Sequence, residues 1–274
     1  MASVGWDRVA AARGRWADRA AVWTRAATET ILEASHLRPD MHVLDLASGP
    51  GEPAIPIAAA LGPTGSITAT DPEPEMLAVI SERAAARRFS ALTCRLAEAE
   101  HLPFPSATFD LVTCRFGVMH FSDPARAMRE AHRVLVGGGR LVLLAWGPWQ
   151  DSDQFPATLG VVSRHLPNPP DIAGSLQFRF ADPEGLAALL LQAGFRHSFA
   201  EVRDVPWCWP GTAEEVWQCI QETAAGTTRK ILDAIPEDRR PQVDREVLEA
   251  IRKYESGGSV RFRARLVLAC GEKG

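Results

Sequence analysis

The sequence has few of the features that mark secreted, membrane or nucleic-acid-binding proteins. Its five cysteines form no C-x-x-C pair and no metal-ligand spacing, which predicts a reduced, cytoplasmic protein without a metal site. No apolar run reaches the about 20 residues that span a bilayer, and no apolar segment of a secretory signal opens the chain. The formal net charge is only −4, so we expect neither a nucleic-acid surface nor stable membrane insertion.

Short apolar strands alternate with helices between about residues 41 and 147. Continuous apolar strands between helices predict a parallel sheet that is covered on both faces, and therefore an α/β fold. The apolar stretch at 259–270 predicts a final antiparallel strand. The expected strands of the first part are HVLDLA, SITATD, ALTCRL, FDLVTCRF and VGGGRLVLLAW, and the expected helices cover 52–61, 74–88 and Asp123 to about Leu135.

The alternation is looser in the rest of the chain. Residues 1–34 indicate an amphipathic helix in which Val9, Trp16 and Trp23 recur every seven residues. A helix is expected over 182–193, and mostly helical structure over 212–255. We therefore predict one domain, residues 1–274, with a helical substrate cap. The expected core is 35–147, 182–206 and 259–271, and the expected cap is 1–34, 148–181 and 207–258.

A glycine turn follows the first strand, in VLDLASGPGEPAIPIAAALG. Gly49, Gly51 and Ala54 satisfy the pattern G-x-G-x-x-G/A, and Asp71 lies twenty residues after Gly51. This spacing is typical of dinucleotide sites, in which an acidic residue binds a ribose hydroxyl. An NAD(P)-dependent oxidoreductase is therefore one alternative.

Two features of this turn argue against a pyrophosphate ligand. Asp45 lies four residues before Gly49 and would repel a pyrophosphate, whereas it would attract an ammonium or sulfonium group. Pro53 and Pro56 also remove N–H donors that would bind phosphate at the start of the helix. S-adenosylmethionine (SAM) has a cationic tail and no phosphate, so it satisfies both observations.

Three blocks of the sequence, in this order and spacing, resemble class I SAM-dependent methyltransferases. VLDLASGPGEPAIPIA resembles their motif I, TATDPEPEML resembles the acidic end of their second strand, and the block from 97 to 146 resembles their adenine-binding loop and strands 4 and 5. The combination is closest to the type-11 group, which includes the ubiquinone/menaquinone-biosynthesis methyltransferases. The resemblance implies a Rossmann-like, seven-stranded, mostly parallel sheet and a small-molecule acceptor.

The resemblance also assigns residues to the cofactor. It implies that Asp45 lies near the amino group of the methionine moiety and that Asp71 accepts hydrogen bonds from both ribose hydroxyls. Gly49 and Gly51 would let the backbone approach the tail, where a Cβ would collide with it. Glu98, in place of the usual Asp, would accept a hydrogen bond from the adenine amino group. The other positions implied are Ala47 (in place of the first glycine), Pro72, Met76, Ala99 through its N–H, and Arg115 through its backbone.

The acceptor site is expected in the parts of the chain that least resemble the family. Their many aromatic residues predict an apolar pocket for an aromatic or lipid-like acceptor. His120 is the candidate catalytic residue, and Trp16, Trp149 and Trp209 are candidates for the wall. C, O and N acceptors are all compatible with the sequence, and a homodimer stays open. A SAM-binding partner protein without catalytic activity is the remaining alternative.

Overall fold

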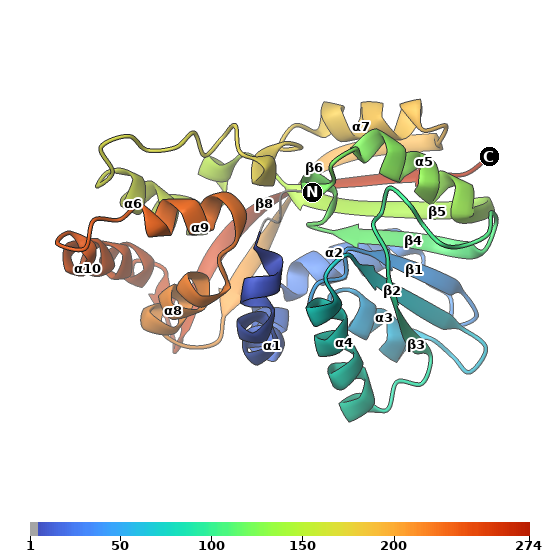
Figure 1. Ribbon diagram of the computed structural model, residues 1–274, viewed down its shortest axis with the longest axis horizontal. Coiled ribbons are helices and arrows are strands. Elements are labelled where there is room, and N and C mark those ends of the chain that lie inside the picture. Colours follow the sequence, from blue (N-terminus) through green and yellow to red (C-terminus); the bar gives the residue numbers. More distant parts are fainter. Residues whose placement is uncertain (1–4) are drawn as a thin grey trace.

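A mixed eight-stranded sheet forms the centre of the molecule in the computed structural model, which describes residues 5–274 (Figure 1). The strand order is β3-β2-β1-β4-β5-β8-β6, and the short β7 pairs with β8 outside this path. β1 to β5 are parallel, and β8 runs antiparallel between β5 and β6. The bounds are β1 (His42–Leu46), β2 (Ser66–Asp71), β3 (Leu92–Leu96), β4 (Phe109–Arg115), β5 (Leu135–Trp146), β6 (Arg196–Trp209), β7 (Glu255–Ser256) and β8 (Ser259–Glu272).

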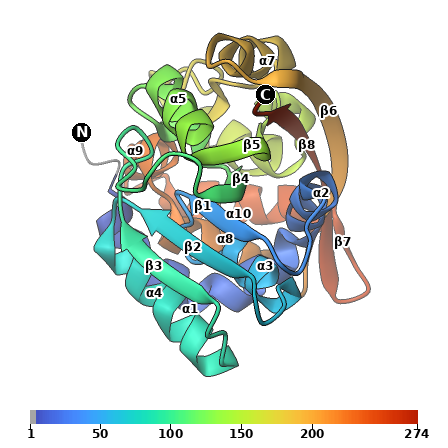
Figure 2. The ribbon, with the colours of Figure 1, turned by 90° about the vertical axis from the view of Figure 1, so that its right-hand side faces the viewer.

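Helices cover both faces of the sheet, as the continuous apolar strands predict. α5 and α7 lie on one face, and α2, α3 and α4 lie on the other (Figures 1 and 2). Asp123 caps α5 by accepting the N–H of Arg126, and Asp182 caps α7 by accepting the N–H of Glu184. The bounds are α2 (Arg25–Ser35), α3 (Ala54–Ala60), α4 (Pro74–Arg87), α5 (Pro124–Val134) and α7 (Pro183–Gln192).

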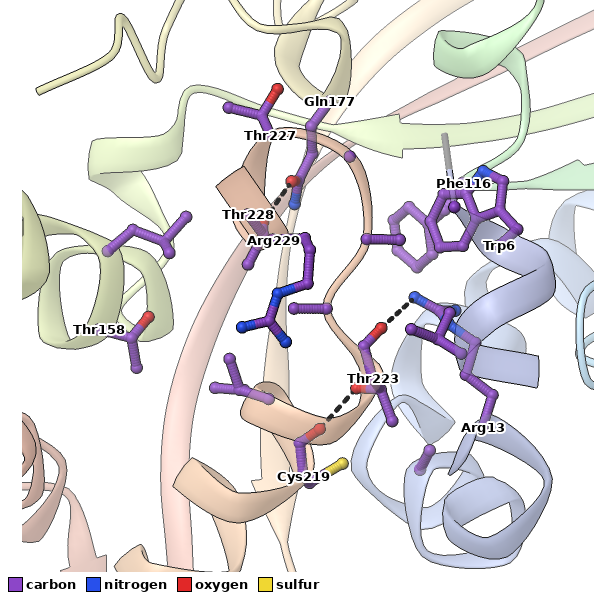
Figure 3. A pocket seen from close by; sticks show the side chains of 18 of the residues that line it. Trp6, Arg13, Phe116, Thr158, Gln177, Cys219, Thr223, Thr227, Thr228 and Arg229 are labelled. Atoms are coloured by element: carbon purple, nitrogen blue, oxygen red, sulfur yellow. Dashed lines mark hydrogen bonds between the residues drawn. The ribbon is translucent and has the colours of Figure 1, made fainter. Parts of the chain in front are cut away.

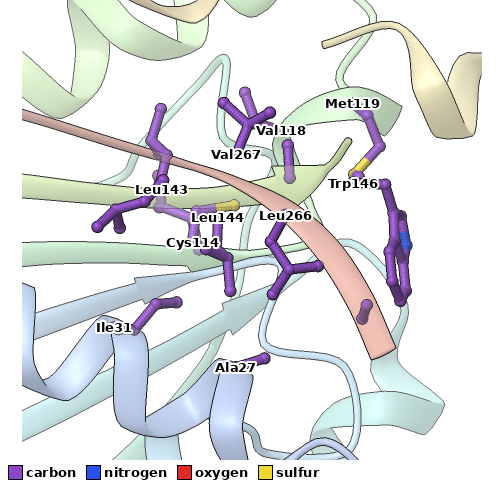
Figure 4. Packing of buried hydrophobic residues seen from close by; sticks show 14 of the residues in the cluster. Ala27, Ile31, Cys114, Val118, Met119, Leu143, Leu144, Trp146, Leu266 and Val267 are labelled. Carbon is purple, nitrogen blue, oxygen red and sulfur yellow. The ribbon is translucent and has the colours of Figure 1, made fainter. Parts of the chain in front are cut away.

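The single N-terminal helix predicted over 1–34 is wrong, because the chain bends at Thr24. α1 (Trp6–Trp23) ends there and α2 begins at Arg25, while residues 1–4 of the prediction lie outside the described chain. The Thr24 hydroxyl accepts a hydrogen bond from the Arg115 guanidinium at 2.7 Å, which fixes the bend. α2 then packs against the sheet through Ala27 and Ile31 (Figure 4), so it belongs to the core and not to the cap.

A helical lobe stands beside the sheet at the end where β6 and β8 extend beyond their neighbours (Figure 1). α1 lies between this lobe and the sheet and contacts both α4 and α8. The lobe also holds the predicted helical segment after residue 212, broken before Gly226 and around Pro236 as expected. No helix within residues 5–274 is long and apolar enough to cross a membrane. The lobe helices are α6 (Val161–Ser163), α8 (Ala213–Thr223), α9 (Gly226–Asp233) and α10 (Arg240–Arg252).

Candidate active site

The glycine turn after β1 is fastened to the end of β2. The N–H of Ser48 donates to the carbonyl of Thr70, and the N–H of Gly49 donates to Oδ2 of Asp71 at 2.9 Å. Ala47, Gly49 and Gly51 all have positive φ, at 51°, 52° and 109°. Left-handed backbone favours glycine at such positions. The turn thus lies at the carboxyl edge of the sheet, where open α/β sheets bind ligands.

Gly51 is required for a different reason from the one expected. A Cβ at Gly51 would lie 2.9 Å from Cγ1 of Ile55 and 3.1 Å from Nη1 of Arg83, so the collision would be with the protein itself. A Cβ at Gly49 would have no described atom within 4 Å. Gly49 therefore faces open space, whereas Gly51 allows the turn to pack on α3 and α4.

Asp45 is a buried carboxyl group with one unsatisfied oxygen. Its Oδ1 accepts the hydroxyl of Thr113 at 2.6 Å, but its Oδ2 is buried and has no partner among the described residues. Burial raises the pKa of Asp45 to about 7, which the hydrogen bond from Thr113 only partly opposes. An ammonium group or a water bound to Oδ2 would satisfy the oxygen and favour the ionised form. The site therefore fits the cationic tail of SAM.

Asp71 closes the other side of the glycine turn. Its Oδ1 accepts the N–H of Glu73 at 3.0 Å, and its Oδ2 accepts the N–H of Gly49. Burial raises the pKa of the carboxyl group, and the two backbone N–H groups oppose that rise. Each carboxylate oxygen keeps a second lone pair. Asp71 can therefore shape the turn and still accept hydrogen bonds from a ligand.

The remaining predicted cofactor residues differ in how far they are buried. Met76 is buried in α4 and Ala99 is buried after β3, whereas the Glu98 side chain is 48% exposed and its nearest described ion partner is His101 at 3.7 Å. Pro72 follows Asp71 directly. The roles predicted for these four residues stay predictions.

Arg115 links three parts of the molecule through its side chain. The guanidinium donates to the carbonyl of Glu52 at 3.2 Å and to the hydroxyl of Thr24 at 2.7 Å. Burial lowers the pKa of this group. The contact predicted for the Arg115 backbone stays a prediction. The sequence did not indicate that the Arg115 side chain joins β4, the glycine turn and the bend between α1 and α2.

A cavity of about 1110 Å³ begins beside Pro50 of the glycine turn and extends into the lobe (Figure 3). Rings form much of its wall near the sheet. Phe116 stacks on Trp146 with ring centroids 4.6 Å apart, and Trp6 meets His120 edge-on at 5.3 Å. Trp16 lines the cavity as predicted.

Two of the predicted wall residues lie elsewhere. Neither Trp149 nor Trp209 is among the described residues that line the cavity. Trp209 is fully buried behind Trp16, with ring centroids 5.5 Å apart, because β6 continues into the lobe and turns this side chain into its core. Trp6, Trp23, Phe116, Trp146 and Trp207 provide aromatic surface instead.

His120 lines the cavity and lies in a short 3-10 helix after β4 (Val118–His120). Burial, together with the nearby charges of Arg13 and Arg179, lowers the pKa of His120 to about 4. The imidazole is therefore neutral at physiological pH. Its Nδ1 is buried and has no partner among the described residues, so it is free to bond a ligand or a water.

Glu100 is a buried residue that the sequence analysis missed. Its Oε1 accepts the N–H groups of Ser122, at 2.7 Å, and Asp123, at 3.2 Å. These bonds fix the segment that follows His120. Glu98 and Glu100 both precede Leu102 in the run AEAEHL, and nothing in that run distinguished the buried carboxylate from the exposed one.

Comparisons with known proteins agree with this geometry. The family described as "Methyltransferase domain" matches residues 44–143. A demethylmenaquinone methyltransferase of Deinococcus radiodurans is 36% identical over an alignment of 185 residues, and the alignment covers 64% of this chain and 74% of that protein. A demethylmenaquinone methyltransferase of Thermus thermophilus is 33% identical and aligns with 63% of this chain and 80% of that protein. A ubiquinone/menaquinone biosynthesis C-methyltransferase of Ralstonia nicotianae is 40% identical, but over only 44% of this chain and 49% of that protein.

Solved structures share the fold. The YcgJ protein of Bacillus subtilis superposes with a TM-score of 0.58 at 21% identity and covers 90% of this chain and 97% of that one. The chain belongs to the SAM-dependent methyltransferase family, in the group that includes the ubiquinone/menaquinone-biosynthesis methyltransferases. It is an enzyme whose cofactor is SAM. None of these comparisons supports the oxidoreductase alternative.

Proposed function

We propose that this enzyme transfers the methyl group of SAM to a hydroxylated aromatic acceptor of the hydroquinone class. The observation that carries the proposal is the cavity of about 1110 Å³, which begins at the glycine turn and is walled by aromatic rings and the neutral His120. The Deinococcus and Thermus relatives are named demethylmenaquinone methyltransferases, and these names support an acceptor of this class. The cytoplasmic location and the homodimer stay predictions.

The residues at the carboxyl edge of the sheet would hold the cofactor. Asp45 offers its unsatisfied Oδ2 to the amino group, and Asp71 offers its remaining lone pairs to the ribose. Ala47, Gly49 and Gly51 shape the turn beside the tail. When bound, SAM supplies an electrophilic methyl group. The protein then has to orient the acceptor and exclude water, which can contribute several kcal/mol to the lowering of the barrier.

The pH dependence of cofactor affinity tests the role of Asp45. The pKa of about 7 in the free protein means that Asp45 is mostly protonated at pH 6. A bound ammonium group favours the carboxylate, so binding must release a proton and affinity must increase as pH rises toward 7. We expect the affinity for S-adenosylhomocysteine to increase about fivefold between pH 6 and pH 7, where an α-amino group stays charged. Calorimetry of Asp45→Asn should show a flat profile, and a flat wild-type profile would refute the assignment.

His120 would orient the acceptor rather than act as a strong base. With a pKa of about 4 it accepts a hydrogen bond at physiological pH, but its low basicity gives it little tendency to hold a full proton. A hydroxyl group of the methyl acceptor could donate a hydrogen bond to His120. It would then lie near Trp6, in the part of the cavity that the stacked rings of Phe116 and Trp146 also line.

Replacing His120 by alanine should lower kcat by roughly tenfold to a hundredfold, because a buried hydrogen bond is worth about 1–3 kcal/mol when its partner is left unsatisfied. The affinity for S-adenosylhomocysteine should stay within about twofold. His120→Asn retains a hydrogen-bond acceptor and should recover part of kcat. The wild-type kcat at saturating SAM should show no transition near pH 6.5 from this residue. Full activity of His120→Ala would remove the role.

The proposed function itself is tested by incubating the enzyme with isotopically labelled SAM and a series of phenols, hydroquinones and amines, and detecting methylated products by mass. We expect product from hydroxylated aromatic compounds. Transfer only to amines would contradict the acceptor class. Tight binding of SAM with no transfer to any of these compounds would also contradict the proposed acceptor class.

A further inference from the structure

Two arginine side chains donate hydrogen bonds to carbonyls at the end of α8. The Arg13 Nη2 donates to the carbonyl of Thr223 at 3.2 Å, and the Arg229 Nη1 donates to the carbonyl of Gln221 at 2.9 Å. Both carbonyls belong to the last turn of α8 and both arginines line the cavity, so the two guanidinium groups approach the corner of the cavity where α8 ends. Carbonyls in the last turn of a helix lack partners within the helix and attract cations.

Each guanidinium group keeps one N–H donor that the described residues do not satisfy. The Nε of Arg13 and the Nε of Arg229 are both buried and have no acceptor among the described residues. Arg229 pairs with Asp233 at 2.9 Å, but within residues 5–274 no carboxylate forms an ion pair with Arg13. Burial disfavours the charged guanidinium and lowers the pKa of Arg13 to about 10. The group is still charged at physiological pH.

The start of α9 lies at the same corner and also lacks an acceptor. Its N-terminal cap is Ala225, which has no side-chain oxygen for the first N–H groups. Ala225, Gly226, Thr227 and Thr228 all line the cavity. Thr228 donates its hydroxyl to Gln177 at 3.2 Å, so the donors left at this corner are the backbone N–H groups at the start of α9 (Figure 3).

The charges on the cavity wall are unequal. Figure 3 shows the Arg229 guanidinium directed toward the middle of the pocket and Arg13 on the side of Trp6. A cavity with excess positive charge and unsatisfied N–H donors at one corner is suited to an anion. The charged residues on its wall are the basic Arg8, Arg13, Arg229 and Lys230 and the acidic Asp7 and Asp233.

We infer that Arg13, Arg229 and the start of α9 bind an acidic substituent of the methyl acceptor, and that the enzyme prefers aromatic acids to uncharged aromatic compounds. This inference rests on the proposed function, because it places the ring of the same acceptor against the aromatic wall. A planar carboxylate matches the fork of N–H donors on a guanidinium group.

A matched pair of ligands tests the inference without requiring the natural acceptor. Calorimetry would compare 6-hydroxy-2-naphthoate with 2-naphthol, both titrated into the complex of the enzyme with S-adenosylhomocysteine. We expect the naphthoate to bind at least tenfold more tightly, and its advantage to shrink as salt is raised, because ion pairing in a partly open cavity is screened. Equal binding of the two compounds, or binding of neither, would overturn the inference.

Three variants separate the proposed site from a general effect of charge. Arg229→Gln should abolish the preference for the naphthoate, and Arg229→Lys should retain part of it. Arg245→Gln removes an exposed arginine from α10 of the same lobe and should change nothing. Thermal melting of each variant would show that the fold is kept. Persistence of the preference in Arg229→Gln would overturn the inference.

The cofactor also carries a carboxylate, so its affinity must be measured in the same variants. Arg229→Gln should bind S-adenosylhomocysteine as the wild type does. A loss of that affinity would assign the corner to the cofactor and overturn the inference. Methyl transfer to uncharged phenols as efficient as to phenolic acids would also overturn it, while leaving the proposed function intact.

Discussion

Replacing Asp71 by alanine is expected to weaken the binding of S-adenosylhomocysteine by roughly 1.5–3 kcal/mol, which is about tenfold to 150-fold. Two losses combine in this variant. The proposed ribose hydroxyls lose a charged acceptor, and the N–H of Gly49 loses the bond at 2.9 Å that fastens the glycine turn to β2. Calorimetry at constant pH would measure the change.

Asp110 provides a matched control for this variant. Its carboxylate also accepts a backbone N–H, from His42 at 2.8 Å, but it lies where β1 and β4 begin, at the opposite edge of the sheet. Asp110→Ala should therefore lower stability and leave the affinity for S-adenosylhomocysteine unchanged. Unchanged affinity in Asp71→Ala itself would show that Asp71 does not hold the cofactor.

Gly51→Val is expected to lower the free energy of unfolding by roughly 2–4 kcal/mol, because it combines backbone strain at φ 109° with a collision with Ile55. In a chain of this size the corresponding decrease of Tm is about 5–10 °C. Thermal melting of the free protein would measure it. The loss should be present without any ligand, since the collision is within the protein.

Gly49→Ala distinguishes packing from ligand binding at the same turn. The φ of Gly49, 52°, lies in the left-handed region, and the added Cβ would have no described atom within 4 Å. The free energy of unfolding should therefore decrease by only about 1–2 kcal/mol. If the cofactor occupies that space, its affinity should decrease more than the stability does. A Gly49→Ala protein that binds S-adenosylhomocysteine as well as the wild type would place the cofactor elsewhere.

Much of the fold could be predicted from the sequence because its signals are local. Apolar strands, the Asp-Pro helix starts and the glycine turn each depend on a few adjacent residues, and the structure confirms them. The break at Thr24 could not be predicted, since it depends on Arg115, which is 91 residues away in sequence. Another non-local contact, the pairing of Trp209 with Val260 of β8, carries β6 beyond the core segment expected to end at residue 206.

The candidate site was predictable only where the chemistry is carried by one segment. Asp45, Asp71 and the glycines lie at strand ends that the pattern itself defines. The sequence analysis assigns no role to Arg13, although Arg13 lies four residues after Val9 and three before Trp16 and so shares the aromatic face of the helix. That spacing was the available signal. Arg229 had none, because its place at the cavity results from the packing of α8 and α9.

The two 14-residue strands β6 and β8 run from the parallel sheet into the lobe without a break. The lobe therefore shares its backbone ladder with the core and has no linker about which it could swing as a separate body. We expect the two parts to denature together, in one cooperative transition. The family match, residues 44–143, ends before this shared region begins. The lobe helices α6, α8, α9 and α10 all lie outside this matched segment.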